Sequence, residues 1–220
     1  MLKKRIAVLV SGGGTNLQAL IDAQKNGSLR SGEIVLVISN RSKAYALERA
    51  RQNGIDAVFI SKKEAGSLEG FDHALCDILD RYQIDLVILA GFLTITGEYF
   101  PARYRDRIIN IHPALIPAFC GKGFYGLHVH EAVLEYGVKV TGATVHFVNE
   151  ITDGGAIILQ KAIPVLEDDT PETLQQRVMH ECEWKLLPEA AELYCAERLQ
   201  IEGRHVRILP ETKTDTEENQ

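Results

Sequence analysis

The sequence predicts an α/β protein built on a doubly wound, mostly parallel sheet. Short apolar segments with the character of β-strands alternate with segments that have the period of amphipathic helices. One strand segment, 85–90, is almost entirely apolar, as expected of a strand that is buried on both faces. Strands that alternate with helices along a chain form parallel sheets with right-handed crossover connections.

The predicted elements follow one another in a regular order. Each of the first three strand segments precedes a helical segment, and a short helical piece separates the fourth strand from the fifth. The predicted strands are 5–10, 34–39, 57–60, 85–90 and 108–111. The predicted helices are 17–23, 44–52, 71–82 and 127–136.

The last third of the chain departs from this order. Two long β-type segments, 138–148 and 156–165, are separated by only seven residues and are expected to form a β-hairpin. Thr170 followed by Pro171 is a helix start, and a long helix is expected to run to about residue 197. We therefore expect a single domain over 1–200. Residues 201–220 are expected to form a strand or tail that is partly disordered.

The composition excludes several classes of protein. The chain has 220 residues, a formal net charge of -6 and a pI near 5.7, which argue against a nucleic-acid partner but not against a phosphorylated small substrate. No apolar segment approaches the roughly 20 residues that cross a bilayer, and the apolar segment 6–10 is too short for a signal peptide. The four cysteines form no CxxC motif. They indicate reduced thiols in a cytoplasmic protein.

A glycine-rich loop joins the first strand to the first helix. Residues 11–16 read SGGGTN, and glycines let the backbone approach an anion closely while the helix start supplies free N–H groups. We expect a phosphate site here, with Thr15 and Asn16 as side-chain donors. The dinucleotide fingerprint fails, because Leu17 stands where its third glycine should be. The alternative is a plain tight turn.

Asn110, His112 and Asp153 are the candidate catalytic residues. Asn110 and His112 end an apolar strand, and Asp153 follows a second β-type segment in the sequence Asp-Gly-Gly. Taken singly, each residue is more often a turn former or a structural histidine. Together they place an amide, an imidazole and a carboxylate at strand exits, where open α/β sheets bind their ligands.

These residue types suit the transfer of a formyl group to an amine. The amide N–H of Asn110 can stabilise a tetrahedral oxyanion, and His112 can protonate the leaving nitrogen. The carboxylate of Asp153 favours the imidazolium and is expected to raise the pKa of His112. No covalent nucleophile is evident.

The remaining histidines are weaker candidates. His146 alternates with apolar residues in a strand and is expected in the core or behind the site. A zinc site of His112, His128 and His130 is disfavoured, because positions i and i+2 of a helix point to different faces. We predict no metal.

With these residues in view, the chain resembles the folate-dependent glycinamide ribonucleotide formyltransferases of purine synthesis. The matching stretches are 8–18 (VLVSGGGTNLQ), 89–92 (LAGF), 109–117 (INIHPALIP) and 145–148 (VHFV), the last leading into 153–155 (DGG). The resemblance extends from about residue 4 to 195 and implies a Rossmann-like formyltransferase fold.

The resemblance also implies a reaction. The formyl group of 10-formyltetrahydrofolate, a co-substrate, would pass to the amine of 5'-phosphoribosylglycinamide through a tetrahedral intermediate, with Asn110, His112 and Asp153 as the catalytic trio. Both partners would be small molecules, and the protein a monomer or homodimer. The residues implied to bind the phosphoribosyl substrate are Gly14, Thr15, Asn16, Gly91 and Glu183. Those implied to line the folate pocket are Leu93, Thr94, Ile95, Thr96 and Asn110.

Three features depart from the family pattern. Leu93-Thr94 replaces Met-Arg, Leu68 stands where an arginine is expected, and the loop 120–126 is longer than usual. These departures concern folate contacts and loop behaviour rather than the chemistry. Separately, aligning Glu183 with a family glutamate near the substrate requires a one-residue insertion.

Related formyltransferases and one different class remain as alternatives. A formyltetrahydrofolate hydrolase would carry an additional N-terminal domain, for which a first strand at about residue 5 leaves no room. A methionyl-tRNA formyltransferase would carry a basic RNA-binding domain, and a sugar-nucleotide N-formyltransferase would usually be longer. A non-catalytic phosphate-binding module would not require His112 beside Asp153.

Overall fold

One twisted sheet forms the centre of the molecule. The computed structural model describes residues 2–94 and 96–211, and over these residues seven strands pair in the order β3-β2-β1-β4-β5-β6-β7. Their bounds are β1 (Lys4–Val10), β2 (Gly32–Ser39), β3 (Asp56–Phe59), β4 (Leu86–Leu89), β5 (Ile108–His112), β6 (Val140–Phe147) and β7 (Ile157–Pro164). The strands β1 to β5 are parallel, β6 is antiparallel to β5, and β7 is antiparallel to β6. The predicted mostly parallel sheet and its β6–β7 hairpin are confirmed.

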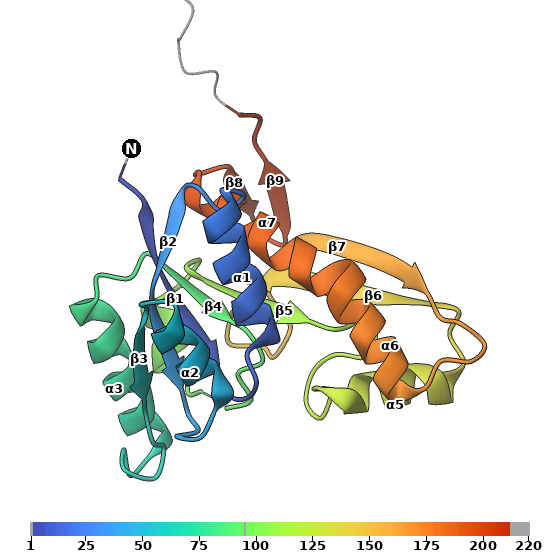
Figure 1. The fold of residues 1–220 in the computed structure, drawn as a ribbon, viewed down its shortest axis with the longest axis horizontal. Helices are drawn as coiled ribbons and strands as arrows, with labels where there is room; N and C mark the ends of the chain where they lie inside the picture. Colours follow the sequence, from blue (N-terminus) through green and yellow to red (C-terminus); the bar gives the residue numbers. More distant parts are fainter. Residues whose placement is uncertain (1, 95, 212–220) are drawn as a thin grey trace, which may run out of the picture.

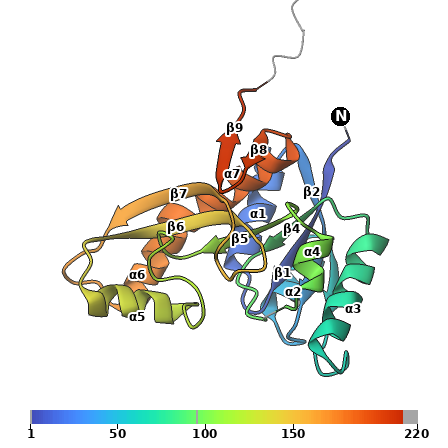
Figure 2. The same ribbon diagram turned by 180° about the vertical axis from the view of Figure 1, so that it is seen from behind.

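Helices cover both faces of the sheet (Figures 1 and 2). The α-helices are α1 (Thr15–Asn26), α2 (Tyr45–Gln52), α3 (Leu68–Arg81), α4 (Tyr99–Arg103), α5 (Leu127–Tyr136), α6 (Pro171–Val178) and α7 (Trp184–Cys195). Figure 1 shows α1 and α7 in front of the sheet, and Figure 2 shows α3 and α4 on the opposite face.

Two apolar clusters fill the spaces between the sheet and its helices. Alternate residues of β1 divide between them, because successive side chains of a strand point to opposite faces. Val8 packs with α1 and α7, while Leu9 packs with Phe71 of α3 and Phe100 of α4. From Ile6 to Val10 β1 is buried on both faces, and its sequence there is apolar, as is that of β4.

The strand order creates a switch point between β1 and β4. The chain leaves β1 toward β2 on one side, and returns through α3 to β4 on the other. The connections that follow β1 and β4 therefore diverge at the carboxyl edge of the sheet, where this architecture binds ligands. The glycine loop follows β1, and the segment that begins with Gly91 follows β4.

The predicted C-terminal helix is interrupted. Between α6 and α7 the chain forms a π-helical turn, η1 (Met179–Glu183), in place of the continuous helix expected from Thr170 to about residue 197. A π turn takes up one extra residue without ending a helix. Glu183, whose alignment with the family requires a one-residue insertion, is the last residue of η1.

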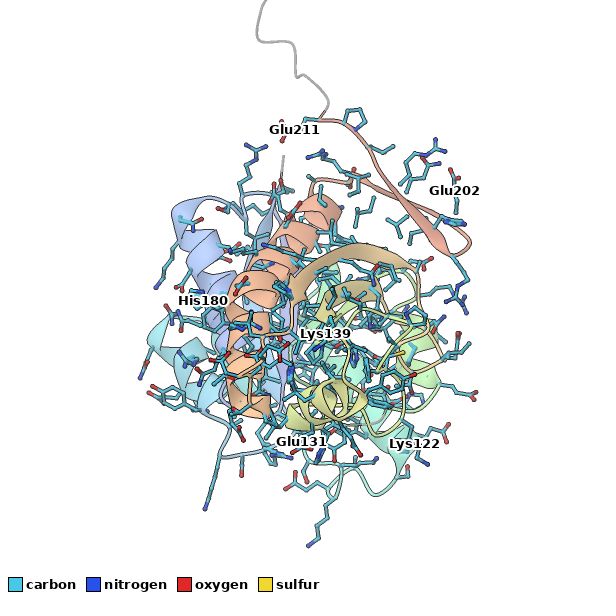
Figure 3. All side chains as sticks on the ribbon, turned by 90° about the vertical axis from the view of Figure 1, so that its right-hand side faces the viewer. Lys122, Glu131, Lys139, His180, Glu202 and Glu211 are labelled. Atoms are coloured by element: carbon cyan, nitrogen blue, oxygen red, sulfur yellow. The ribbon has the colours of Figure 1, made fainter. Side chains whose placement is uncertain are left out.

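A small hairpin follows α7. The strands β8 (Leu199–Glu202) and β9 (His205–Ile208) pair with each other, and the boundary expected at residue 200 falls inside β8. Figure 3 shows Glu202 and Glu211 at this end of the molecule, with Lys122 and Glu131 at the opposite end. Within the described ranges, no helix is both long and apolar enough to cross a membrane.

Candidate active site

The glycine loop exposes the N-terminus of α1. Gly14 has a φ of 75°, a conformation that glycine adopts without strain, and a Cβ there would lie 2.7 Å from the Cβ of Ala46. Two residues of α2 hold the loop carbonyls: Ala46 N–H donates to Gly12 O and Arg49 Nε donates to Gly13 O, at 3.2 and 2.8 Å. The first N–H groups of α1 have no partner within the helix, as at any helix start, and the predicted phosphate site would lie at this end of α1.

Asn16 faces into the protein rather than toward a phosphate. It is buried, and its Nδ2 donates to Glu183 Oε2 at 2.6 Å, while its Oδ1 lies buried without a hydrogen-bond partner. Burial raises the pKa of Glu183 to about 7, against the opposing effect of the Asn16 hydrogen bond. The pair presents acceptor oxygens, so it suits a ligand that carries hydroxyl or amino groups. Thr15 Oγ1 contacts Met179 Sδ at 3.8 Å.

The register of β5 and β6 brings the central polar residues together. Asn110 and His112 are two positions apart on β5, so their side chains share one face of the sheet. Asn110 pairs with His146 of β6, and His112 pairs with Thr144. This antiparallel pairing, which adjacent apolar segments in the sequence do not reveal, sets His146 beside Asn110.

His112 is held by backbone and carboxylate. It is buried, its Nε2 donates to the carbonyl of Phe119 at 2.8 Å, and its Nδ1 lies 3.7 Å from Asp153 Oδ2. Burial lowers the pKa of His112, and the charge of Asp153 opposes this effect without reversing it. The expected effect of Asp153, which is to raise the pKa of His112, is present, but burial outweighs it and the net pKa is lowered rather than raised.

Asp153 is fixed in a tight turn. Its φ is 54°, and its Oδ2 accepts the backbone N–H of Gly121 at 2.8 Å. Burial acts to raise the pKa of Asp153, but contacts with His146, Gly121 and His112 more than offset it, and the pKa is lowered. The group is therefore a carboxylate at neutral pH, as the chemistry requires.

His146 lies beside both the amide and the carboxylate, behind the site, which is one of the two positions that its sequence context predicted. Its Nδ1 donates to the carbonyl of Phe147 at 2.8 Å, so in the neutral ring Nε2 is an acceptor. That Nε2 lies 3.1 Å from Asn110 Nδ2 and 3.5 Å from Asp153 Oδ1. An N–H of Asn110 thus binds His146, which fixes the amide plane and leaves the second N–H for the site. The pairing of β5 with β6, which the sequence does not show, is what sets His146 beside Asn110.

The loop that follows β5 is held by two side chains. Thr144 Oγ1 donates to Ala114 O at 2.7 Å and accepts Ile116 N–H at 3.1 Å. Gln160 Nε2 donates to Ile116 O and to Thr144 Oγ1, both at 3.0 Å, and the Ile116-Pro117 peptide is cis. The same loop supplies the carbonyl of Phe119 to His112 and the N–H of Gly121 to Asp153, so this clamp orients both groups.

The segment after β4 lies beside the glycine loop. Gly91 has a φ of 72°, and its carbonyl accepts Ser11 N–H at 3.1 Å. Leu93 is 48% exposed, and Thr94 and Thr96 are half-buried. Ile95, also predicted to line a folate pocket, lies outside the described residues.

Two other features of the molecule contribute nothing to this site. A groove of about 620 Å³ lies between α1 and α7 and contains none of the residues described above as catalytic candidates. Among the described residues, no three histidine, cysteine or acidic side chains are arranged to hold a metal ion.

Comparisons with known proteins identify the family. The formyl transferase family matches residues 4–191. Phosphoribosylglycinamide formyltransferase of Arabidopsis thaliana is 43% identical over 198 residues, which are 90% of this chain and 67% of the plant protein. The chain belongs to the phosphoribosylglycinamide formyltransferase family.

Larger proteins contain the same unit. The chain is 43% identical to part of the trifunctional purine biosynthetic protein adenosine-3 of Gallus gallus, covering 90% of this chain but only 19% of the chicken protein. Among solved structures, glycinamide ribonucleotide transformylase 1 of Symbiobacterium toebii has a TM-score of 0.89 at 47% identity, over 94% of this chain and 95% of that chain.

The formyltransferase fold is shared beyond the transferases. A formyltetrahydrofolate deformylase of Pseudomonas syringae has a TM-score of 0.84 at 23% identity, over 95% of this chain and 67% of that one. At this identity the likeness concerns the fold alone, so the choice between transfer and hydrolysis depends on the site.

The structure locates the departures from the formyltransferase pattern. Leu68 is the first residue of α3, and Thr94 accepts a hydrogen bond from Asn40 Nδ2. The segment 118–126 precedes α5 and contains glycines with positive φ at 121, 123 and 126.

Proposed function

We propose that the chain transfers the formyl group of 10-formyltetrahydrofolate to the amine of 5'-phosphoribosylglycinamide in purine biosynthesis. The observation that carries this proposal is the arrangement of Asn110, His112 and Asp153, a buried imidazole flanked by an amide donor and an ionised carboxylate. Both substrates are small molecules, and the donor is a co-substrate rather than a resident group.

The residues divide into an acceptor side and a donor side. The N–H groups at the start of α1 would bind the phosphate of the acceptor, and Glu183 with Asn16 would accept hydrogen bonds from its hydroxyl or amino groups. The segment from Gly91 to Thr94 would line the donor pocket. Since β4 lies between β1 and β5, the donor segment that follows β4 would lie between the acceptor loop that follows β1 and the catalytic residues of β5.

Asn110 would stabilise the charge that develops in the reaction. When the amine attacks the formyl carbon directly, the carbonyl oxygen becomes an oxyanion of a tetrahedral intermediate. The N–H of Asn110 that is not directed at His146 can donate to it. One such donor is worth roughly 10²–10³ in rate when it is fixed in advance.

His112 would move the proton. Because its pKa is lowered, the ring is neutral at neutral pH, and Nδ1 is the nitrogen free to accept a proton. The proton that the attacking amine loses would pass to Nδ1, where Asp153 stabilises the imidazolium, and then to the leaving nitrogen. His112 would thus act first as a base and then as the general acid, and no covalent enzyme intermediate is involved.

The test follows the loss of the formyl group by absorbance, using 10-formyltetrahydrofolate or a stable deaza analogue. Turnover that requires 5'-phosphoribosylglycinamide and collapses by roughly 10²-fold or more in His112→Ala would support the proposal. Turnover without an acceptor would point to a hydrolase. Turnover only with an amino-sugar nucleotide would point to the corresponding formyltransferase, and none with any acceptor to a binding module.

A further inference from the structure

Ser11 and Asn40 join the two substrate-binding segments through one hydrogen-bonded chain. Leu93 N–H donates to Ser11 Oγ at 2.8 Å, and Ser11 Oγ–H donates to Asn40 Oδ1 at 2.7 Å. Asn40 Nδ2 in turn donates to Thr94 Oγ1. Ser11 begins the glycine loop, Asn40 follows β2, and Leu93 and Thr94 follow β4, so three strand exits meet in this chain.

The hydrogen bonds of this chain run in one direction. The Ser11 hydroxyl accepts the Leu93 N–H and donates its hydrogen to Asn40 Oδ1. The amide of Asn40 accepts through Oδ1 and donates through Nδ2 to Thr94. Thr94 Oγ1 accepts that N–H, and its hydroxyl hydrogen is directed away from Asn40.

The other end of the same segment is held separately. Asp72 of α3 is fully buried, and its carboxylate accepts Gly97 N–H and Phe100 N–H, both at 3.0 Å. A Cβ at position 97 would lie 2.9 Å from Asp72 Oδ2, so the backbone comes close to the carboxylate there. With Ser11 2% exposed at the other end, the segment is anchored by two buried groups.

We propose that Ser11 and Asn40 are positioning residues for the formyl donor. They fix Leu93 and Thr94 against the glycine loop, and they set the Thr94 hydroxyl as a hydrogen-bond donor toward a carbonyl or carboxylate oxygen of the folate. This assignment rests on the proposed function, because it takes the segment after β4 as the wall of the donor pocket. It gives Thr94, which replaces a family arginine, a defined role.

The experiment measures the dissociation constant of a stable deaza analogue of the formyl donor by calorimetry. Asn40→Ala and Thr94→Val are each expected to weaken its binding about two- to tenfold, the effect of one hydrogen bond. Thr94→Ser keeps the hydroxyl and is expected to bind as the wild type does. The double variant is expected to bind about as weakly as either single variant, because both break the same chain.

Two controls separate positioning from general damage. Asn26→Ala removes another side-chain acceptor of a backbone N–H, that of Ser28, at the far end of α1, and is expected to leave the constant unchanged. The constant for 5'-phosphoribosylglycinamide is expected to stay near the wild-type value in Asn40→Ala. Unchanged donor binding in Asn40→Ala, additive effects in the double variant, or equal weakening for both substrates would overturn the proposal. Failure of the wild type to bind the analogue would instead refute the proposed function.

Discussion

At the scale of single residues, two electrostatic effects compete at His112. Burial disfavours the imidazolium, and Asp153 favours it from 3.7 Å. The balance leaves a ring that is neutral at rest and is readily charged only when a proton is supplied in the site. A group with this property can both accept and return a proton during one turnover.

Replacing Asp153 by Asn tests this balance. Without the carboxylate the pKa of His112 falls further, so the limb of the kcat–pH profile that reports His112 shifts to lower pH. The kcat itself is expected to fall by roughly 10²-fold, since the imidazolium loses its partner. Glu150→Gln removes an exposed carboxylate that pairs with Arg105 and serves as the charge-matched control. An Asp153→Asn profile that coincides with the wild type would contradict this role.

The buried carboxyl group of Glu183 makes the free energy of unfolding depend on pH. Its pKa is raised to about 7 in the folded protein, from an ordinary value of 4.5, so the folded state favours the protonated acid. The stability this confers is complete below pH 4.5 and is lost as the pH rises toward 7. Glu183→Gln, which keeps the acceptor for Asn16, is therefore expected to gain Tm over the wild type as the pH rises between these values. Thermal unfolding at pH 5 and pH 8 checks this, and a Tm difference that is equal at both would count against it.

At the scale of elements, the loop after β5 is important because its backbone orients two side chains that it does not carry. Thr144 and Gln160 fasten it to β6 and β7, and its carbonyl at Phe119 and N–H at Gly121 then reach His112 and Asp153. A loop without catalytic side chains can thus determine the geometry of the catalytic group.

Thr144→Val is expected to loosen this loop. The change leaves the Ile116 N–H without its partner in a buried position, which costs about 1–3 kcal/mol of unfolding free energy, and kcat falls with it. Thr141→Val on the same strand is the matched control, because Thr141 Oγ1 is buried and has no hydrogen-bond partner. The control is expected to be neutral or stabilising. Equal losses of kcat in both variants would show that the clamp has no specific role.

At Gly14, in the glycine loop between β1 and α1, there is no room for a side chain. Gly14→Ala would bring its Cβ to 2.7 Å from Ala46, and the shift of the loop is expected to raise KM for the phosphorylated acceptor more than for the folate. Gly27→Ala has a similar φ, 84°, at the open end of α1, so it carries only the backbone strain of about 1 kcal/mol. Steady-state kinetics of both variants distinguish the two effects, and a normal acceptor KM in Gly14→Ala would place the phosphate elsewhere.

At the scale of the whole molecule, the sheet provides a rigid support for loops from distant parts of the sequence. The central strands β1 and β4 are buried on both sides, whereas β8 and β9 form a small exposed hairpin. We expect hydrogen exchange to be slowest in β1 and β4 and fastest in the hairpin. Comparable protection of both would show that the hairpin unfolds only together with the core.

The residue pattern within each short stretch of the sequence determined where the helices and strands form and which reactive side chains they carry. Apolar periodicity located the seven strands of the sheet and most helices to within a few residues, and the motifs around Gly14, Asn110 and Asp153 indicated the family. These features are readable because a buried strand must be apolar, and because a phosphate loop and a proton carrier require particular residue types at particular spacings.

Only the tertiary structure decided how these groups act on one another. The role of His146 depends on the pairing of β5 with β6, and the inward orientation of Asn16 depends on Glu183, which is 167 positions away in the sequence. The net pKa direction of His112 depends on how deeply it is buried. Burial and contacts between distant segments set each of these outcomes, and neither is a property of local sequence.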